Sequence, residues 1–148
     1  MAPVSDNRLS IAVVNDISAV SRATEQVEAF CKDRGIADAV ARKFSLALDE
    51  TLTNTVSYAF PEGGSHCIAV RIEHCAGYLT ATVSDDGAPF DPLSQAAPDI
   101  HAPVEHRKVG GLGIHLVRSL MEAVEYQRRG ERNELTFRIM DGKGAAAE

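Results

Sequence analysis

The feature that most constrains this chain is a long helical pattern that ends sharply at a proline. From about Asp38 to Ala59, apolar side chains recur at intervals of three and four residues, which is the period of an α-helix buried along one face. The segment FPEGG follows, and Pro61 cannot continue the hydrogen-bonding pattern of a helix. The sequence therefore predicts a buried helix with these residues facing inward: Val40, Phe44, Ala47, Leu48, Leu52 and Val56.

The same helix carries a carboxylate and an amide one turn apart. Glu50 and Asn54 are four positions apart, so both side chains emerge on one face of the helix. Thr53 and Ser57 extend this polar strip. Most strips of this kind are the solvent-facing side of an amphipathic helix. A functional interpretation therefore depends on what the rest of the chain contains.

The remaining chain alternates between strand-like and helical patterns. We expect a strand at 9–15, a helix from about 17 to 35, a hairpin of strands at 66–75 and 78–87, a helix after the glycines at 110–113, and a hairpin of strands at 124–129 and 134–140. Ala76 and Gly77 form the predicted turn of the first hairpin. Residues 88–109 hold four prolines and little periodicity, so they are predicted to be a long loop.

Composition and charge restrict the class of protein. The chain has 148 residues, of which 45% are hydrophobic and 24% charged, as expected for a single domain at 1–148 with its core at about 8–140 and a frayed tail at 141–148. The net charge is −6 and no long basic run is present, so we expect no direct nucleic-acid binding. No apolar run approaches the length of a membrane span. We expect a cytoplasmic protein without membrane contact.

The cysteines do not indicate a disulfide framework or a metal site. Cys31, Cys67 and Cys75 are odd in number and form no C-x-x-C pair. His66 and His74 lie near two of them, but the spacing is poor for zinc ligation. We expect buried, reduced thiols.

A second polar feature stands at the end of a predicted strand, in the segment SDDG. Asp85 carries a carboxylate that only accepts hydrogen bonds, so it can accept from the amino group of adenine but is unfavourable beside the carbonyl oxygen of guanine. Gly87, two residues later, has no side chain to hold off a flat ligand. Asp and Gly are also common in ordinary turns, so this feature alone is weak.

A third polar feature is the glycine cluster that precedes the last predicted helix. The first amide groups of a helix lack partners within it, and Gly110, Gly111 and Gly113 would let phosphate oxygens approach them. A flexible hinge is the alternative. The glycines follow a long loop and no G-K-[ST] ending is present, which excludes a dinucleotide-binding fingerprint and a P-loop. Arg107 and Lys108 could reach the phosphates or simply be solvated.

These features give the polar pair on the long helix a chemical purpose. Magnesium often takes one or two protein oxygens and leaves its other positions to water and phosphate, so the amide oxygen of Asn54 would suffice. Glu50, one turn earlier, could accept a proton from a hydroxyl or water that attacks a γ-phosphate.

The three features together resemble a known superfamily. E-x-x-x-N on a helix, D-x-G after a strand and G-G-L-G-I before a helix, in this order, resemble the Bergerat-fold ATPases, which include gyrase, histidine kinases and mismatch-repair ATPases. LALDETLTNTVSYAF, VSDDGAPFDP and GGLGIHLVRSLMEAVEY are similar to the anti-sigma factor serine/threonine kinases of bacterial partner-switching systems. The resemblance implies an α/β fold: a two-layer sandwich of a mixed, mostly antiparallel sheet with helices on one face, and an ATP lid at about 88–110.

The resemblance also implies roles for individual residues, with ATP and Mg²⁺ as cofactors. Glu50 falls on the catalytic base, Asn54 on the magnesium ligand and Asp85 on the adenine-specifying carboxylate. The other implied nucleotide contacts are Gly87, Arg107, Lys108, Gly110, Gly111, Leu112 and Gly113. The segment NELTF lacks the usual Gly-Thr, which leaves Thr136 as a weaker candidate for a water-mediated adenine contact. The lid also lacks a Thr-Thr-Lys stretch, and Glu122 stands where the family often has Asp.

Three functions are compatible with this pattern to different degrees. The resemblance implies an ATP-dependent protein kinase that phosphorylates a small antagonist protein and, when free of it, silences a sigma factor; homodimers are common in the family. A module that binds ATP only to set its shape, and sequesters a partner without phosphate transfer, is the main alternative. A histidine-kinase catalytic domain is less expected, because no histidine precedes the second helix.

Overall fold

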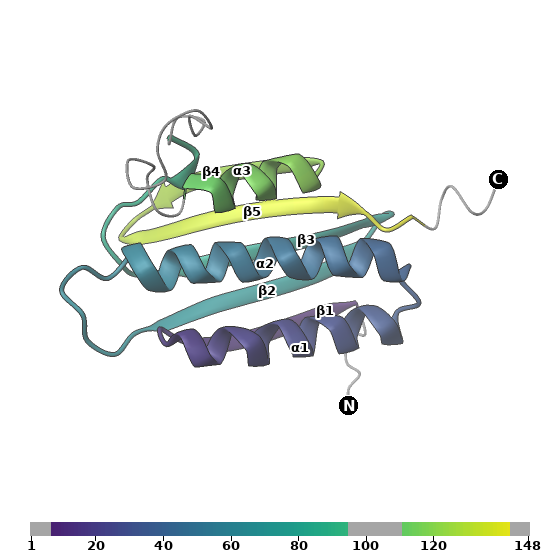
Figure 1. The fold of residues 1–148 in the computed structure, drawn as a ribbon, viewed down its shortest axis with the longest axis horizontal. Helices are drawn as coiled ribbons and strands as arrows, with labels where there is room; N and C mark the ends of the chain where they lie inside the picture. Colours follow the sequence, from purple (N-terminus) through teal and green to yellow (C-terminus); the bar gives the residue numbers. More distant parts are fainter. Residues whose placement is uncertain (1–6, 95–110, 143–148) are drawn as a thin grey trace.

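The computed structural model describes residues 7–94 and 111–142, which form one five-stranded sheet with three α-helices on one face (Figure 1). The elements are β1 (Arg8–Val14), α1 (Ile17–Asp33), α2 (Asp38–Tyr58), β2 (Cys67–Cys75), β3 (Tyr78–Asp85), the 3₁₀ turn η1 (Pro92–Ser94), α3 (Gly111–Leu120), β4 (Ala123–Arg129) and β5 (Arg132–Met140). The strand order is β1-β2-β3-β5-β4, and all four described pairings are antiparallel. In these two ranges, no helix has the length and apolarity needed to cross a bilayer.

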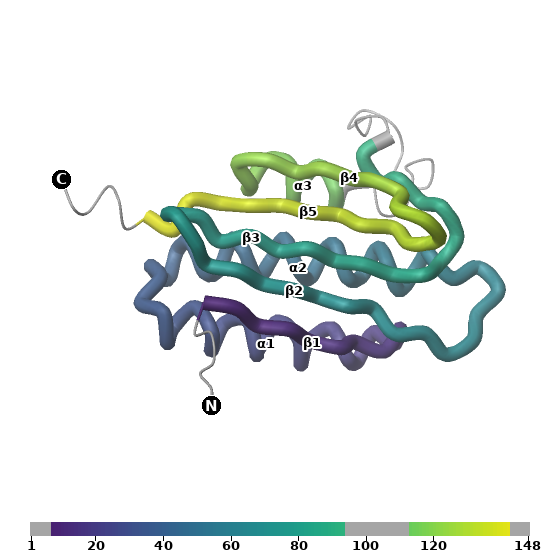
Figure 2. Tube along the Cα trace, turned by 180° about the vertical axis from the view of Figure 1, so that it is seen from behind, coloured from purple at the N-terminus to yellow at the C-terminus, as the bar shows by residue number. Residues whose placement is uncertain are grey.

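The core lies between the sheet and the helical layer. Figure 1 shows α2 running between α1 and α3, and the view from behind in Figure 2 shows the strands with no helix in front of them. Alternate residues of β2 and β3 are buried, because successive side chains of a strand point to opposite faces of the sheet. Phe44 of α2 packs against Phe137 of β5, with ring centroids 5.4 Å apart. The predicted two-layer α/β class is confirmed.

Both predicted hairpins are present. In the β2–β3 turn, Ala76 and Gly77 have φ angles of 57° and 85°, and two successive positive φ angles match the twist of the flanking strands. The β4–β5 turn uses Gly130, whose φ is 62°. At the start of α1, the Asp16 carboxylate accepts a hydrogen bond from the Ser18 N–H, and this bond holds the pKa of Asp16 below its usual value.

The prediction of buried thiols is correct for one cysteine and wrong for the other two. Cys31 is buried on the inner side of α1, and burial raises the pKa of its thiol to about 11. Cys67 and Cys75 are exposed. They occupy alternate positions of β2 that point to the outer face, away from the helices, so their thiols do not enter the core.

Three polar side chains, Arg34, His74 and Asp141, form a hydrogen-bonded cluster at the end of the sheet where β2 finishes. The Arg34 Nε donates to His74 Nδ1 at 3.0 Å, so His74 donates from Nε2 to Asp141 Oδ2, 2.8 Å away. Asp141 was expected at the start of a frayed tail, but it is 5% exposed and belongs to the folded core. Residues 143–148 of that predicted tail lie outside the described part of the chain.

Candidate functional site

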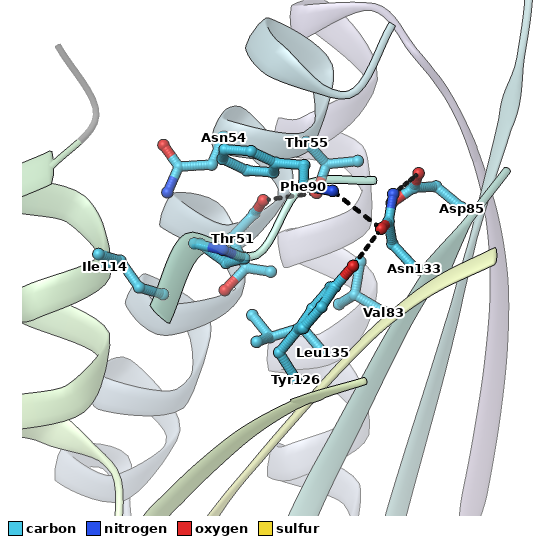
Figure 3. A pocket seen from close by; sticks show the side chains of 11 residues that line it. Thr51, Asn54, Thr55, Val83, Asp85, Phe90, Ile114, Tyr126, Asn133 and Leu135 are labelled. Atoms are coloured by element: carbon cyan, nitrogen blue, oxygen red, sulfur yellow. Dashed lines mark hydrogen bonds between the residues drawn. The ribbon is translucent and has the colours of Figure 1, made fainter. Parts of the chain in front are cut away.

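A pocket lies between α2, the end of β3, the facing parts of β4 and β5, and the first turns of α3. It encloses about 330 Å³, including the part open to solvent. Its lining is apolar in the middle and polar at two ends, as Figure 3 shows. The lining residues are Thr51, Asn54, Thr55, Val83, Asp85, Phe90, Pro92, Ile114, Tyr126, Asn133 and Leu135.

The first polar end is built around Asp85, the last residue of β3. Its position follows the buried alternation of that strand, so its carboxylate points inward and the residue is 4% exposed. Oδ1 accepts the Gly87 N–H at 2.8 Å and the Asn133 Nδ2 at 2.9 Å. Within the described residues, no hydrogen bond is recorded to Oδ2. The carboxylate therefore keeps one oxygen available on a wall of the pocket.

The structure gives a different reason for the glycine at position 87 from the one expected, which was room for a flat ligand. A β-carbon at position 87 would lie 2.8 Å from the β-carbon of Ala59 and still closer to its carbonyl oxygen. The neighbouring Ala88 N–H donates to that same carbonyl at 2.8 Å. The missing side chain thus lets the segment after β3 pack against the end of α2, and this contact holds Asp85 beside the helix.

One face of α2 forms the wall opposite the sheet. Thr51 and Thr55 donate their hydroxyl hydrogens to backbone carbonyls one turn earlier, at 2.8 and 3.0 Å. These bonds satisfy the hydroxyl groups within the helix. Asn54 is 7% exposed, and Figure 3 shows its amide pointing toward the α3 side of the pocket, away from Asp85. Thr53 and Ser57, the other members of the predicted polar strip, do not line the pocket. The Thr53 hydroxyl donates to the Asp49 carboxylate, and Ser57 is exposed.

The second polar end is the place where α3 begins. A β-carbon at Gly113 would lie 2.6 Å from Glu50 Oε2 and 3.7 Å from Asn54 Nδ2. The first turn of α3 therefore lies against both polar side chains of α2, and the absence of a side chain at Gly113 permits the approach. The first amide groups of such a helix lack intrahelical partners and attract anions.

The remaining predicted contacts divide into three groups. Gly111 and Leu112 belong to the first turn of α3. Arg107, Lys108 and Gly110 lie outside the described residues. Thr136 is on the outer face of the sheet, where its hydroxyl is 3.4 Å from that of Thr82. The alternation of β5 buries its neighbours instead, so the structure does not bring Thr136 to the pocket.

Three residues that complete the pocket beside Asp85 were not predicted from the sequence. Asn133 faces Asp85 directly in the β3–β5 register, and Tyr126 donates its hydroxyl hydrogen to Asn133 Oδ1 at 2.6 Å. Phe90 covers the pocket and packs on Tyr58, with ring centroids 5.8 Å apart. The inward alternation of Asn133 with Leu135 could have identified the asparagine as a buried polar residue.

A family model described as the histidine kinase-like ATPase domain matches residues 13–139, which run from the end of β1 to the last but one residue of β5. The chain belongs to the histidine kinase-like ATPase family. The resemblance drawn from the three motifs is confirmed at this level, together with the two-layer fold.

Curated relatives of this ATPase domain are named as protein kinases. It is 34% identical over 97 residues to the serine/threonine-protein kinase BtrW of Bordetella bronchiseptica, covering 64% of this chain and 68% of that protein. It is 34% identical over 84 residues to the serine-protein kinase RsbW of Bacillus cereus, covering 54% of this chain and 52% of the relative. The domain thus spans about half the length of RsbW.

Solved structures share the fold of this ATPase domain. A crystal structure of the RsbU and RsbW domains of a Mycobacterium tuberculosis protein matches with a TM-score of 0.63 and 17% identity, over 94% of this chain and 32% of the other. A blue-light activated histidine kinase of Erythrobacter litoralis matches with a TM-score of 0.57 and 21% identity, over 75% of this chain and 33% of the other. At these identities the likeness establishes the fold alone.

Proposed function

We propose that this domain is an ATP-dependent protein serine/threonine kinase of the partner-switching type. It would transfer the γ-phosphate of ATP to a small antagonist protein, and bind a sigma factor or an equivalent regulator when free of that antagonist. The names of the relatives support the kinase activity. We further propose that the chain folds as a single domain, acts in the cytoplasm and can form a homodimer.

The observation that carries the proposal is the contact between α2 and the start of α3. Glu50 is half-buried against Gly113, at the helix end where phosphate groups would be attracted. A carboxylate held there can accept the proton of an attacking hydroxyl. Asp85 lies at the other end of the pocket, where its Oδ2 suits a purine amino group. This arrangement supports binding of a nucleoside triphosphate with its base at the Asp85 end and its phosphates at the α3 end.

The residues present also fit a magnesium ion carried by the nucleotide. Magnesium prefers oxygen ligands and commonly uses one or two from the protein, with phosphate and water for the rest. The Asn54 amide is buried and points to the end of the pocket where α3 begins. When bound, ATP supplies the phosphoryl group and the ion neutralises its charge. Asn54 would hold the ion, and Asn54→Ala should remove the magnesium dependence of nucleotide binding.

The decisive test compares two carboxylates that are adjacent on α2. Glu50→Gln should reduce phosphate transfer from labelled ATP to the antagonist by about 100-fold or more, because the general base is lost, while ADP affinity stays within about twofold. Asp49→Asn is the matched control, since Asp49 is exposed and accepts a hydrogen bond only from Thr53 among the described residues. It should leave both quantities unchanged.

Two results would contradict parts of the proposal, the first the role of Glu50 and the second the kinase activity itself. Transfer at the wild-type rate by Glu50→Gln would remove Glu50 from the chemistry. A wild-type protein that binds both ATP and the antagonist but transfers no phosphate would instead be a sequestering module, in which the nucleotide only sets the shape.

A further inference from the structure

Asn133 lies at the Asp85 end of the pocket, beside the segment that follows β3. Its Nδ2 group donates to Asp85 Oδ1 at 2.9 Å and to the Ala88 carbonyl at 2.8 Å. Its Oδ1 accepts the Phe90 N–H at 3.1 Å and the Tyr126 hydroxyl at 2.6 Å, as Figure 3 shows in part. The reversed amide would place an acceptor against two acceptors, so these partners determine its orientation.

This orientation determines how Asp85 presents its carboxylate. Asn133 and the Gly87 N–H both donate to Oδ1, so rotation of the carboxylate would break two hydrogen bonds. Arg128 stabilises both donors to Asp85, because its Nη1 donates to the Gly87 carbonyl at 2.8 Å and to Asn133 Oδ1 at 3.3 Å. Asp85 is therefore held with Oδ2 as the oxygen available to a ligand.

We propose that Asn133 is a positioning residue for base selectivity. By holding Oδ1 of Asp85, it presents Oδ2 to the amino group at position 6 of a purine without loss of side-chain freedom on binding. Through Ala88 and Phe90, it also ties this carboxylate to the segment that covers the pocket. The proposal rests on the proposed nucleotide-binding function.

The test measures two ligands against two asparagine variants by titration calorimetry. The ligands are ADP and the diphosphate of purine riboside, which lacks the 6-amino group. Asn133→Ala should weaken ADP binding by about tenfold, while the analogue loses less than about threefold. Asn15→Ala is the matched control, because Asn15 also uses both amide atoms, with Gly64 and His66 at 2.9 Å, away from the pocket. It should leave the ratio of the two affinities unchanged.

Equal losses for the two ligands in Asn133→Ala would overturn the proposal, because they would show general damage to the pocket. A wild-type protein that binds the two ligands equally would contradict the assignment of Asp85 instead. The two failures are therefore distinguishable.

A second variant keeps the proposal testable if Asn133→Ala does not fold. Asn133→Asp retains the size of the side chain and its acceptor toward Tyr126 and Arg128, but it places a second carboxyl against Asp85. At low pH the introduced carboxyl can carry a proton and donate to Asp85 again. ADP affinity of this variant should therefore rise, relative to wild type, between about pH 8 and about pH 5. A pH profile parallel to that of wild type would contradict the direct contact.

Discussion

Gly113 lies against the carboxylate of Glu50: a β-carbon at position 113 would be 2.6 Å from Glu50 Oε2. The two residues come from different helices, α3 and α2, and are far apart in the sequence. Their contact is the point where the candidate base meets the helix end that would receive phosphate groups. The site therefore requires a residue without a side chain at position 113.

Gly113→Ala should separate stability from activity. Alanine is favoured over glycine within a helix by about 0.5–1 kcal/mol, and the clashing atom is the end of a flexible side chain that can move. We therefore expect a melting temperature close to that of wild type and phosphate transfer reduced at least about tenfold, because Glu50 is displaced. Ser119→Ala, on an exposed part of α3, is the control and should transfer normally. Normal transfer by Gly113→Ala would show that displacement of Glu50 does not matter.

Asp85→Asn should change which base the pocket prefers. The donors of Gly87 and Asn133 would hold the new amide oxygen, so its NH₂ group would face the ligand. ADP should bind at least about tenfold more weakly, since two donors would meet, and IDP, with a carbonyl at position 6, should lose less. Titration calorimetry with both nucleotides checks this expectation. ADP affinity equal to wild type would remove Asp85 from base recognition.

Gly87→Ala should destabilise the fold. The added methyl would meet the backbone and β-carbon of Ala59, neither of which can rotate away. Overpacking of this kind costs about 1–3 kcal/mol, which lowers the melting temperature of a domain of this size by roughly 3–10 °C. Ala88→Ser, at the exposed neighbouring position, should leave the melting temperature unchanged. Wild-type stability of Gly87→Ala would mean that this close approach is not required.

The three thiols should differ in their reactivity. Cys67 and Cys75 are exposed, whereas Cys31 is buried and its pKa is raised to about 11, so little thiolate forms at neutral pH. Titration with a thiol reagent should consume two thiols quickly and the third only after denaturation. The variant Cys31→Ser should keep the whole fast phase, and loss of part of that phase would contradict the assignment.

Much of the architecture was predictable because it depends on local periodicity. The helical period of α2, the alternation in β2 and β3, and the turn at Ala76–Gly77 are each encoded within a short segment, and the structure places these elements as expected. The resemblance of the three motifs extended this prediction to the two-layer fold.

The candidate site was predictable only in part. Glu50, Asn54 and Asp85 stood out because polar residues interrupt apolar patterns, and the structure places all three at the pocket or beside it. Thr136 was suggested by the family resemblance alone, and the alternation of β5 turns its side chain to the outer face of the sheet, away from the pocket. The exposed cysteines were mistaken for the same reason, since residue type does not reveal which face of a sheet a helix will cover.

The sequence by itself determined the helices, the strands and the chemical types of the candidate catalytic residues, because these depend on neighbours along the chain. Only the tertiary structure decided that Asn133 faces Asp85 and that Gly113 meets Glu50. Both contacts join residues that are distant in sequence, and they form only when β5 pairs with β3 and α3 packs beside α2. Hydrogen-bond partners and close approaches of this kind depend on three-dimensional register, which no local pattern contains.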